Sequence, residues 1–92
     1  MSELLNEAKK LYVQNDMVGS LEKTNCILLS DNCNSEAFLL RARIYNKMGN
    51  WGFAMNDYGA VLEIEPENQE AKSGIEMAKN ILGYFTPDIF NP

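Results

Sequence analysis

The sequence predicts an all-α domain built from two helix-turn-helix units that repeat with a period of 34, followed by a C-terminal capping helix. Residues 1–34 can be written above residues 35–68 without a gap, and buried-looking positions then match in character. The clearest matches are Leu4 over Phe38, Ala8 over Ala42, Leu11 over Tyr45, Met17 over Trp51, and Ile27-Leu28 over Val61-Leu62. Apolar residues follow helical spacing, and no segment shows the alternation of a strand.

Each unit contains two predicted helices. The first helices are expected over residues 3–14 and 36–48, where apolar residues recur at i, i+4 and i+7. The second helices are expected over residues 17–29 and 51–64, and a fifth helix over residues 69–84.

Helix boundaries are indicated by residues that cap or stop a helix. Asp16 and Asn50 can accept hydrogen bonds as N-caps of the second helices, and Gly49 can take the positive φ that ends a helix. Pro66 prevents the fourth helix from continuing. Asn68 is expected to start the fifth helix.

The second unit holds suitable residues at eight fixed positions, namely Phe38, Ala42, Tyr45, Gly49, Trp51, Ala54, Tyr58 and Pro66. With the period of 34, these residues resemble the tetratricopeptide repeat (TPR) family, and the chain length is similar to that of short stand-alone bacterial TPR proteins. The first unit departs from the pattern at Ser20, Thr24 and Asn32. The resemblance covers residues 1–83 and implies an α-α superhelix, or solenoid.

We expect one TPR-like domain over residues 1–92. Repeat one would span 1–34, repeat two 35–68, the capping helix 69–84 and an apolar tail 85–92. The outward faces of the first and fifth helices are polar, as the ends of a solenoid require. The sequence therefore predicts a complete five-helix stack.

The resemblance implies that the first helix of each unit lines a concave groove holding an extended or helical peptide. The expected groove residues are Leu5, Lys9, Tyr12, Leu39, Arg43, Asn46, Lys47 and Met77, with Val13 and Asn80 beside them. Three cations among apolar side chains predict an apolar ligand with one or two acidic groups. Alternatively, the cations pair with Glu36 and similar neighbours, while Tyr12 and Leu39 complete the core.

One TPR subtype binds the acidic C-termini of heat-shock chaperones through a clamp of Lys, Asn and Arg side chains. The matching positions in this chain are Leu5, Lys9, Leu40, Glu70 and Gly74. None of them carries the clamp's residue, and Glu70 has the opposite charge. Binding of chaperone tails is therefore disfavoured.

Composition argues against several other functions. The formal net charge of -5 disfavours nucleic-acid and membrane partners. Without His, a Gly-rich phosphate loop or metal-ligand spacing, we expect no enzyme, cofactor or metal site. Cys26 and Cys33 are expected to be reduced, and a cytoplasmic location is expected because no secretion signal or long apolar run is present. The carboxylates around Pro66 are expected to be solvated helix-end groups, namely Glu63, Glu65, Glu67 and Glu70.

Two functional hypotheses follow. The first is a non-catalytic module that binds a protein or peptide in the groove. The alternative is a structural protein whose surfaces serve self-assembly. We expect a monomer or a weak homodimer. The apolar tail, with Tyr84, Phe85, Ile89 and Phe90, is expected to fold back over Met77 and Ile81, or else to dock on another subunit.

Overall fold

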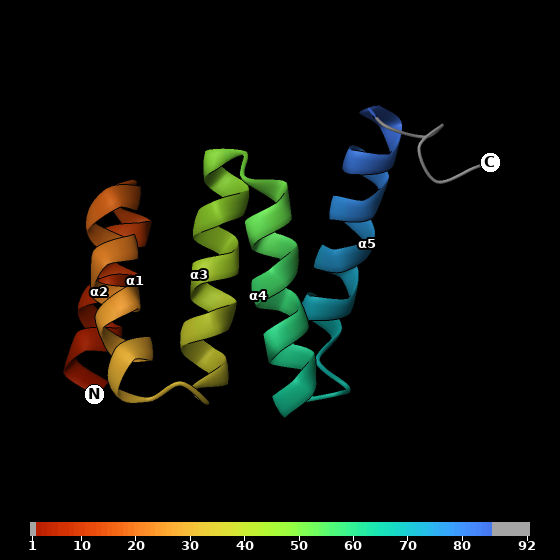
Figure 1. Ribbon diagram of the computed structural model, residues 1–92. Coiled ribbons are helices and arrows are strands. Elements are labelled where there is room, and N and C mark those ends of the chain that lie inside the picture. The colour runs from red at the N-terminus through yellow and green to blue at the C-terminus, as the bar shows by residue number, and fades with distance from the viewer. Residues whose placement is uncertain (1, 86–92) are drawn as a thin grey trace.

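The computed structural model describes residues 2–85, and these residues form five α-helices (Figure 1). The helices are α1 (Ser2–Val13), α2 (Met17–Ser30), α3 (Ser35–Met48), α4 (Trp51–Ile64) and α5 (Gln69–Phe85). Each predicted helix is present at nearly its expected limits. The all-α fold class is thus confirmed for the described residues.

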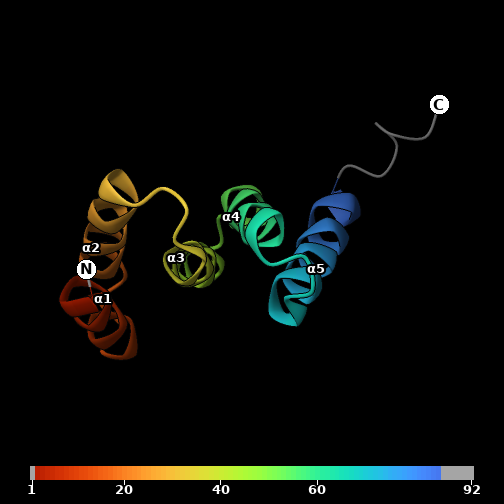
Figure 2. The same cartoon turned by 90° about the horizontal axis from the view of Figure 1, so that it is seen from below.

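The helices stand side by side and run alternately up and down (Figure 1). Seen from below, α1, α3 and α5 follow one side of the stack, while α2 and α4 follow the other (Figure 2). The stack measures 48 × 27 × 21 Å, and α3 touches both α1 and α2 as well as α4. This arrangement is compatible with the predicted superhelix, while the division into two repeats and a cap stays a prediction.

The turn inside each unit has the same backbone form. Gly49 has φ +79°, as predicted, and Asn15, at the equivalent position of the first unit, has φ +66°. Both residues lie in the left-handed region, which Gly and Asn adopt most readily. The internal repeat therefore extends to the turn conformation.

Side-chain caps begin three of the helices. The carboxylate of Asp16 accepts the Gly19 N–H at 2.9 Å at the start of α2. The amide oxygen of Asn68 accepts the Ala71 N–H at 2.9 Å at the start of α5. The predictions for Asp16 and Asn68 are confirmed.

The prediction for Asn50 is wrong, because its side chain caps nothing at the start of α4. Asn50 is exposed and lies beside a small hollow next to Gly52 and Phe53, so its amide is open to solvent. A further cap belongs to Asn34, whose side chain accepts the Ala37 N–H at 3.0 Å. Asn34 begins α3 without having been singled out in the sequence.

The core consists of three small clusters along the stack instead of one central core. Small side chains at the crossings, including Ala42 and Ala54, have no exposed surface and let the helices approach closely. The clusters are Ala42, Ala54, Tyr58, Val61 and Ala71; Ala8, Leu40 and Ile44; and Ile27, Leu28 and Ala37. Each cluster is shared by no more than three successive helices, so the packing is local along the stack, as in a solenoid.

Two polar residues replace apolar ones in the first unit without leaving unpaired groups. Ser20 and Thr24 are fully buried. The Ser20 hydroxyl donates to the Ala8 carbonyl at 2.7 Å, and the Thr24 hydroxyl donates to the Ser20 carbonyl at 2.7 Å. Because buried hydroxyls are tolerated when they are hydrogen-bonded, the departures from the TPR pattern at these two positions are accommodated.

Arg41 links three helices. Its Nε donates to Asp57 Oδ2 at 2.8 Å and its Nη2 to Asp57 Oδ1 at 2.9 Å, while Nη1 donates to Asn25 Oδ1 at 2.9 Å. The side chain of Asp57 is only 6% exposed. Hydrogen bonding to Asp57 raises the pKa of Arg41 above its usual value. This polar group therefore ties α2, α3 and α4 together.

The predicted tail over residues 85–92 lies outside the described residues, apart from the helical backbone of Phe85. Its proposed contacts with Met77 and Ile81, or with another subunit, stay predictions. Within residues 2–85, no helix combines the length and the apolar character needed to cross a bilayer.

Candidate functional site

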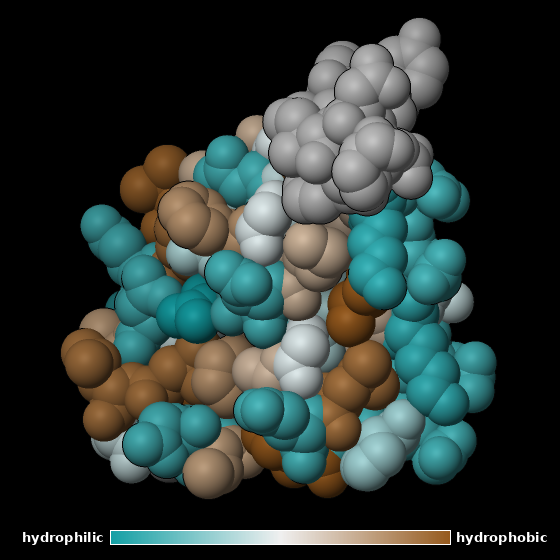
Figure 3. All heavy atoms as spheres, turned by 45° about the vertical axis from the view of Figure 1, so that its right-hand side comes forward, coloured by the Kyte–Doolittle hydropathy of each residue, from teal (hydrophilic) through white to brown (hydrophobic). Residues whose placement is uncertain are grey.

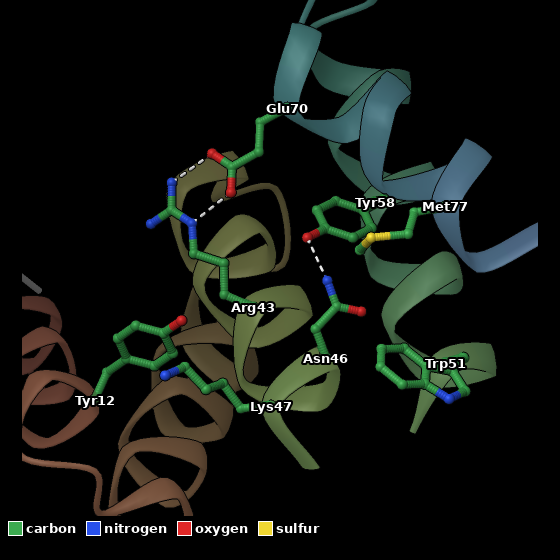
Figure 4. Close-up of a pocket in the computed structure, with 8 residues that line it drawn as sticks. All are labelled: Tyr12, Arg43, Asn46, Lys47, Trp51, Tyr58, Glu70 and Met77. Carbon is green, nitrogen blue, oxygen red and sulfur yellow. Dashed lines mark hydrogen bonds and ion pairs between the residues drawn. The ribbon is translucent and has the colours of Figure 1, made fainter. Parts of the chain in front are cut away.

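A hollow of about 680 Å³ opens between α1, α3, α4 and α5. The residues lining it are Tyr12, Arg43, Asn46, Lys47, Trp51, Tyr58, Glu70 and Met77 (Figure 4). α1 supplies Tyr12, α3 supplies Arg43, Asn46 and Lys47, α4 supplies Trp51 and Tyr58, and α5 supplies Glu70 and Met77. The hollow thus brings together five of the eight residues expected in the groove, namely Tyr12, Arg43, Asn46, Lys47 and Met77.

The other three expected groove residues lie elsewhere. Leu5 and Leu39 are partly buried and pack on the hydrophobic clusters. Lys9 forms an ion pair on the exposed side of α1. For Leu39, the placement matches the alternative that it completes the core. Tyr12 has both roles, because it packs against the cluster of Ala8, Leu40 and Ile44 and also lines the hollow.

One end of the hollow holds a bidentate ion pair between α3 and α5. Arg43 donates from Nε to Glu70 Oε2 and from Nη2 to Glu70 Oε1, each at 2.6 Å (Figure 4). These hydrogen bonds lower the pKa of Glu70 and raise the pKa of Arg43 relative to their usual values. The charge of Arg43 is therefore already matched within the chain.

The same ion pair occurs one repeat earlier. Lys9 on α1 donates to Glu36 on α3 at 2.7 Å. Arg43 follows Lys9 by 34 positions, and Glu70 follows Glu36 by 34 positions. The alternative that groove cations pair with Glu36 and similar neighbours thus describes both of these cations.

Lys47 differs from the other two cations. Its ammonium nitrogen lies 5.6 Å from the centre of the Tyr12 ring, a cation–π distance. Its side chain is exposed, and it forms no ion pair with the carboxylates of residues 2–85. Lys47 is therefore the cation of the hollow whose charge remains open to a ligand.

The floor of the hollow contains a hydrogen bond from the Asn46 amide to the Tyr58 hydroxyl at 2.9 Å. The other amide atom, Oδ1, is buried and has no partner among the described residues. Figure 4 shows it turned away from Tyr58, on the side where Trp51 and Met77 lie. Burial raises the pKa of Tyr58, so its hydroxyl is held in the protonated form.

Gly74 allows Tyr58 to take this place. A Cβ atom on Gly74 would overlap the Tyr58 ring. Because α5 has no side chain there, the ring packs directly on its backbone while the hydroxyl reaches Asn46. Trp51 and Met77 complete an apolar wall, and Met77 is 47% exposed.

Three lining residues were not expected in the groove: Trp51, Tyr58 and Glu70. The sequence identified Trp51 and Tyr58 as packing positions of the repeat, and Glu70 as a solvated helix-end carboxylate. A usable signal existed for Glu70, because it stands one full repeat after Glu36, just as Arg43 stands one full repeat after Lys9. The part of the chain that the structure describes contains no group of three side chains able to hold a metal ion.

Large apolar side chains are also exposed on the helices away from the hollow. Leu29 on α2 is 87% exposed and Phe53 on α4 is 59% exposed. Phe53 packs against Tyr45 with ring centres 5.3 Å apart. On the face shown in Figure 3, apolar side chains gather in patches separated by hydrophilic ones.

Comparison with known proteins gives relatives but no family assignment. No protein-family model matches the chain. The chain is 35% identical over 78 residues to the DnaJ protein P58IPK homolog of Arabidopsis thaliana, and 33% identical over 78 residues to homolog B of Oryza sativa subsp. japonica. Each alignment covers 85% of this chain but only about a sixth of the relative. These relatives contain TPR repeats, and the five-helix stack fits a TPR-like unit.

Proposed function

We propose that this chain is a non-catalytic interaction module that binds a segment of a partner protein in the hollow between α1, α3, α4 and α5. The observation that carries the proposal is the hollow itself. It combines an apolar wall with a cation and a hydrogen-bond acceptor that have no ion-pair or hydrogen-bond partner within residues 2–85. Such a mixture of apolar wall and few polar groups is typical of binding sites.

The similarity to TPR-containing relatives supports a role in protein binding. The volume of about 680 Å³ accommodates a few side chains of a bound segment, whereas a folded domain would need a broader surface. We further propose a cytoplasmic setting and a monomeric or weakly dimeric state, as the sequence predicts.

Site-specific photo-crosslinking tests the proposal. A photoreactive phenylalanine analogue replaces Met77 in the hollow, and in a control variant it replaces Leu29, which is exposed on α2. We expect a discrete crosslinked protein in native extract from the Met77 variant, and competition by unlabelled wild-type chain. Equal crosslinking from both positions would contradict binding in the hollow.

Self-assembly is the second candidate, and the exposure of Leu29 and Phe53 favours it. A second copy covering these side chains would remove apolar surface from water. Light scattering over a concentration series distinguishes the two candidates. A tight dimer that Leu29→Ser and Phe53→Ser dissociate would support self-assembly, whereas a monomer at high concentration supports the interaction module.

A further inference from the structure

We infer that the ligand of the hollow is an extended peptide segment carrying one carboxylate beside an apolar anchor, and that Lys47, not Arg43, receives the carboxylate. Asn46 Oδ1 would accept a backbone N–H of the same segment. This inference rests on the proposed function and specifies its ligand. Three features of the hollow support it in turn.

The first feature is the repeated ion pair. Lys9 forms an ion pair with Glu36, in the first turn of α3, at 2.7 Å. Arg43 forms one with Glu70, in the first turn of α5, at 2.6 Å. A ligand carboxylate would have to displace Glu36 or Glu70 to use these cations, and would leave that carboxylate unpaired. Lys47 has no such competitor among the described residues, and the residue one repeat earlier is Val13.

The second feature is the charge around Lys47. The whole chain has a formal net charge of -5, and Glu70 lines the same hollow. A run of acidic residues would be repelled by this field, whereas one carboxylate can reach the single open ammonium group. The structure thus favours a segment with one acidic group over a polyanion.

The third feature is the unpaired amide oxygen of Asn46. A buried acceptor without a donor is costly, and a backbone N–H of a bound segment would satisfy it. The oxygen has no exposed surface, so a side chain of the hollow must move for a ligand to reach it. Met77, unbranched and 47% exposed, can move at low cost.

Fluorescence anisotropy with defined peptide pools tests the carboxylate. Three pools of labelled nonapeptides, acetylated and amidated at their ends, share a central triplet randomised over Leu, Ile and Phe. The residue after the triplet is Glu, Gln or Lys, and the remaining positions are Gly and Ser. The full chain should bind the Glu pool about five- to tenfold more tightly than the Gln pool, and the Lys pool most weakly.

The variant Lys47→Gln should abolish the preference for Glu over Gln. The matched control is Lys79→Gln, an exposed lysine of α5 that does not line the hollow. It should keep the preference. Glu70→Gln frees Arg43 and should strengthen binding of the Glu pool. A Glu preference that survives Lys47→Gln, or the same loss in both lysine variants, would overturn the inference.

A methylated backbone tests Asn46. Peptides of the Glu pool with N-methyl groups in the triplet cannot donate those backbone hydrogens. Wild type should lose about tenfold in affinity on methylation, while Asn46→Ala should bind both forms equally. The control Lys79→Gln, outside the hollow, should keep the wild-type loss on methylation. An equal methylation effect in wild type and Asn46→Ala would contradict this contact.

The proposed function and the assigned ligand can fail separately. Amide chemical shifts show where each pool binds. If no pool perturbs residues of the hollow, the proposed function is overturned together with the inference. If all three pools perturb the hollow with equal affinity, the proposed function stands and the inference is wrong.

Discussion

The role of Glu70 depends on a contact with a distant residue, Arg43. From the sequence alone, Glu70 is an acidic residue at the start of a helix, where a carboxylate interacts favourably with the helix dipole. In the fold, it faces Arg43 from α5 with two hydrogen bonds of 2.6 Å. The pair removes one cation from the hollow and leaves Lys47 as the charge available to a partner.

The lowered pKa of Glu70 predicts a pH-dependent stability. Because the folded pKa lies below the usual value of 4.5, this carboxylate stabilises the fold above pH 4.5 and loses that effect as pH falls through the folded pKa. Glu70→Gln should therefore melt lower than wild type at pH 7. The difference in melting temperature should shrink as pH falls below 4.5 and through the folded pKa of Glu70. Glu76→Gln, on the exposed side of α5, serves as the control and should match wild type throughout.

Gly74 gives a second prediction at this scale. Ala normally favours a helix over Gly, by about 1 kcal/mol. At position 74, however, the new Cβ would overlap the Tyr58 ring, which is only 3% exposed and cannot move into solvent freely. We expect Gly74→Ala to lower the free energy of unfolding by about 1–3 kcal/mol.

Gly59→Ala is the matched control, because nothing lies within 4 Å of the added Cβ on α4. It should leave stability unchanged or raise it by up to about 1 kcal/mol. Denaturation curves in urea measure both changes. If the two variants were equally stable, the contact between Gly74 and Tyr58 would not constrain the fold.

At the scale of the element, periodicity and turn residues predicted all five helices of the described chain. The apolar spacing is local, so it can be read from the chain alone. The site was predicted less completely, because Trp51, Tyr58 and Glu70 enter the hollow only through the packing of α4 against α3 and of α5 against α4. Sequence spacing along one helix contains no information about how far a neighbouring helix leans over it.

Caps mark the limit of local prediction, and they give a third testable prediction. Asn34 and Asn50 stand at the starts of α3 and α4, yet only Asn34 makes a side-chain cap. Asn34→Ala should cost about 1 kcal/mol of unfolding free energy, and Asn50→Ala a few tenths at most. Chemical denaturation of the two variants measures the contrast. A larger loss in Asn50→Ala than in Asn34→Ala would contradict the assigned caps.

At the scale of the whole molecule, stability is divided along the stack. The cluster of Ile27, Leu28 and Ala37 joins α2 to α3, while Val61 belongs to the cluster shared by α3, α4 and α5. Because the packing is local along the stack, a mutation in one cluster should destabilise the helices next to that cluster most.

Ile27→Ala should therefore lower stability by about 2–4 kcal/mol and selectively speed amide hydrogen exchange in α1 and α2. Val61→Ala, which removes less side chain, should instead speed exchange in α4 and α5. Hydrogen-exchange mass spectrometry at pH 7 separates the two responses. Uniform loss of protection in both variants would indicate that the stack unfolds as one cooperative unit.

The repeated ion pairs also have a mechanical consequence. Lys9–Glu36 and Arg43–Glu70 connect alternate helices, α1 to α3 and α3 to α5, bypassing the helices between them. They brace alternate helices along one side of the stack and oppose bending that would separate those helices. Because all four side chains are partly exposed, dissolved salt screens these ion pairs. We therefore expect the stack to bend more easily as ionic strength rises.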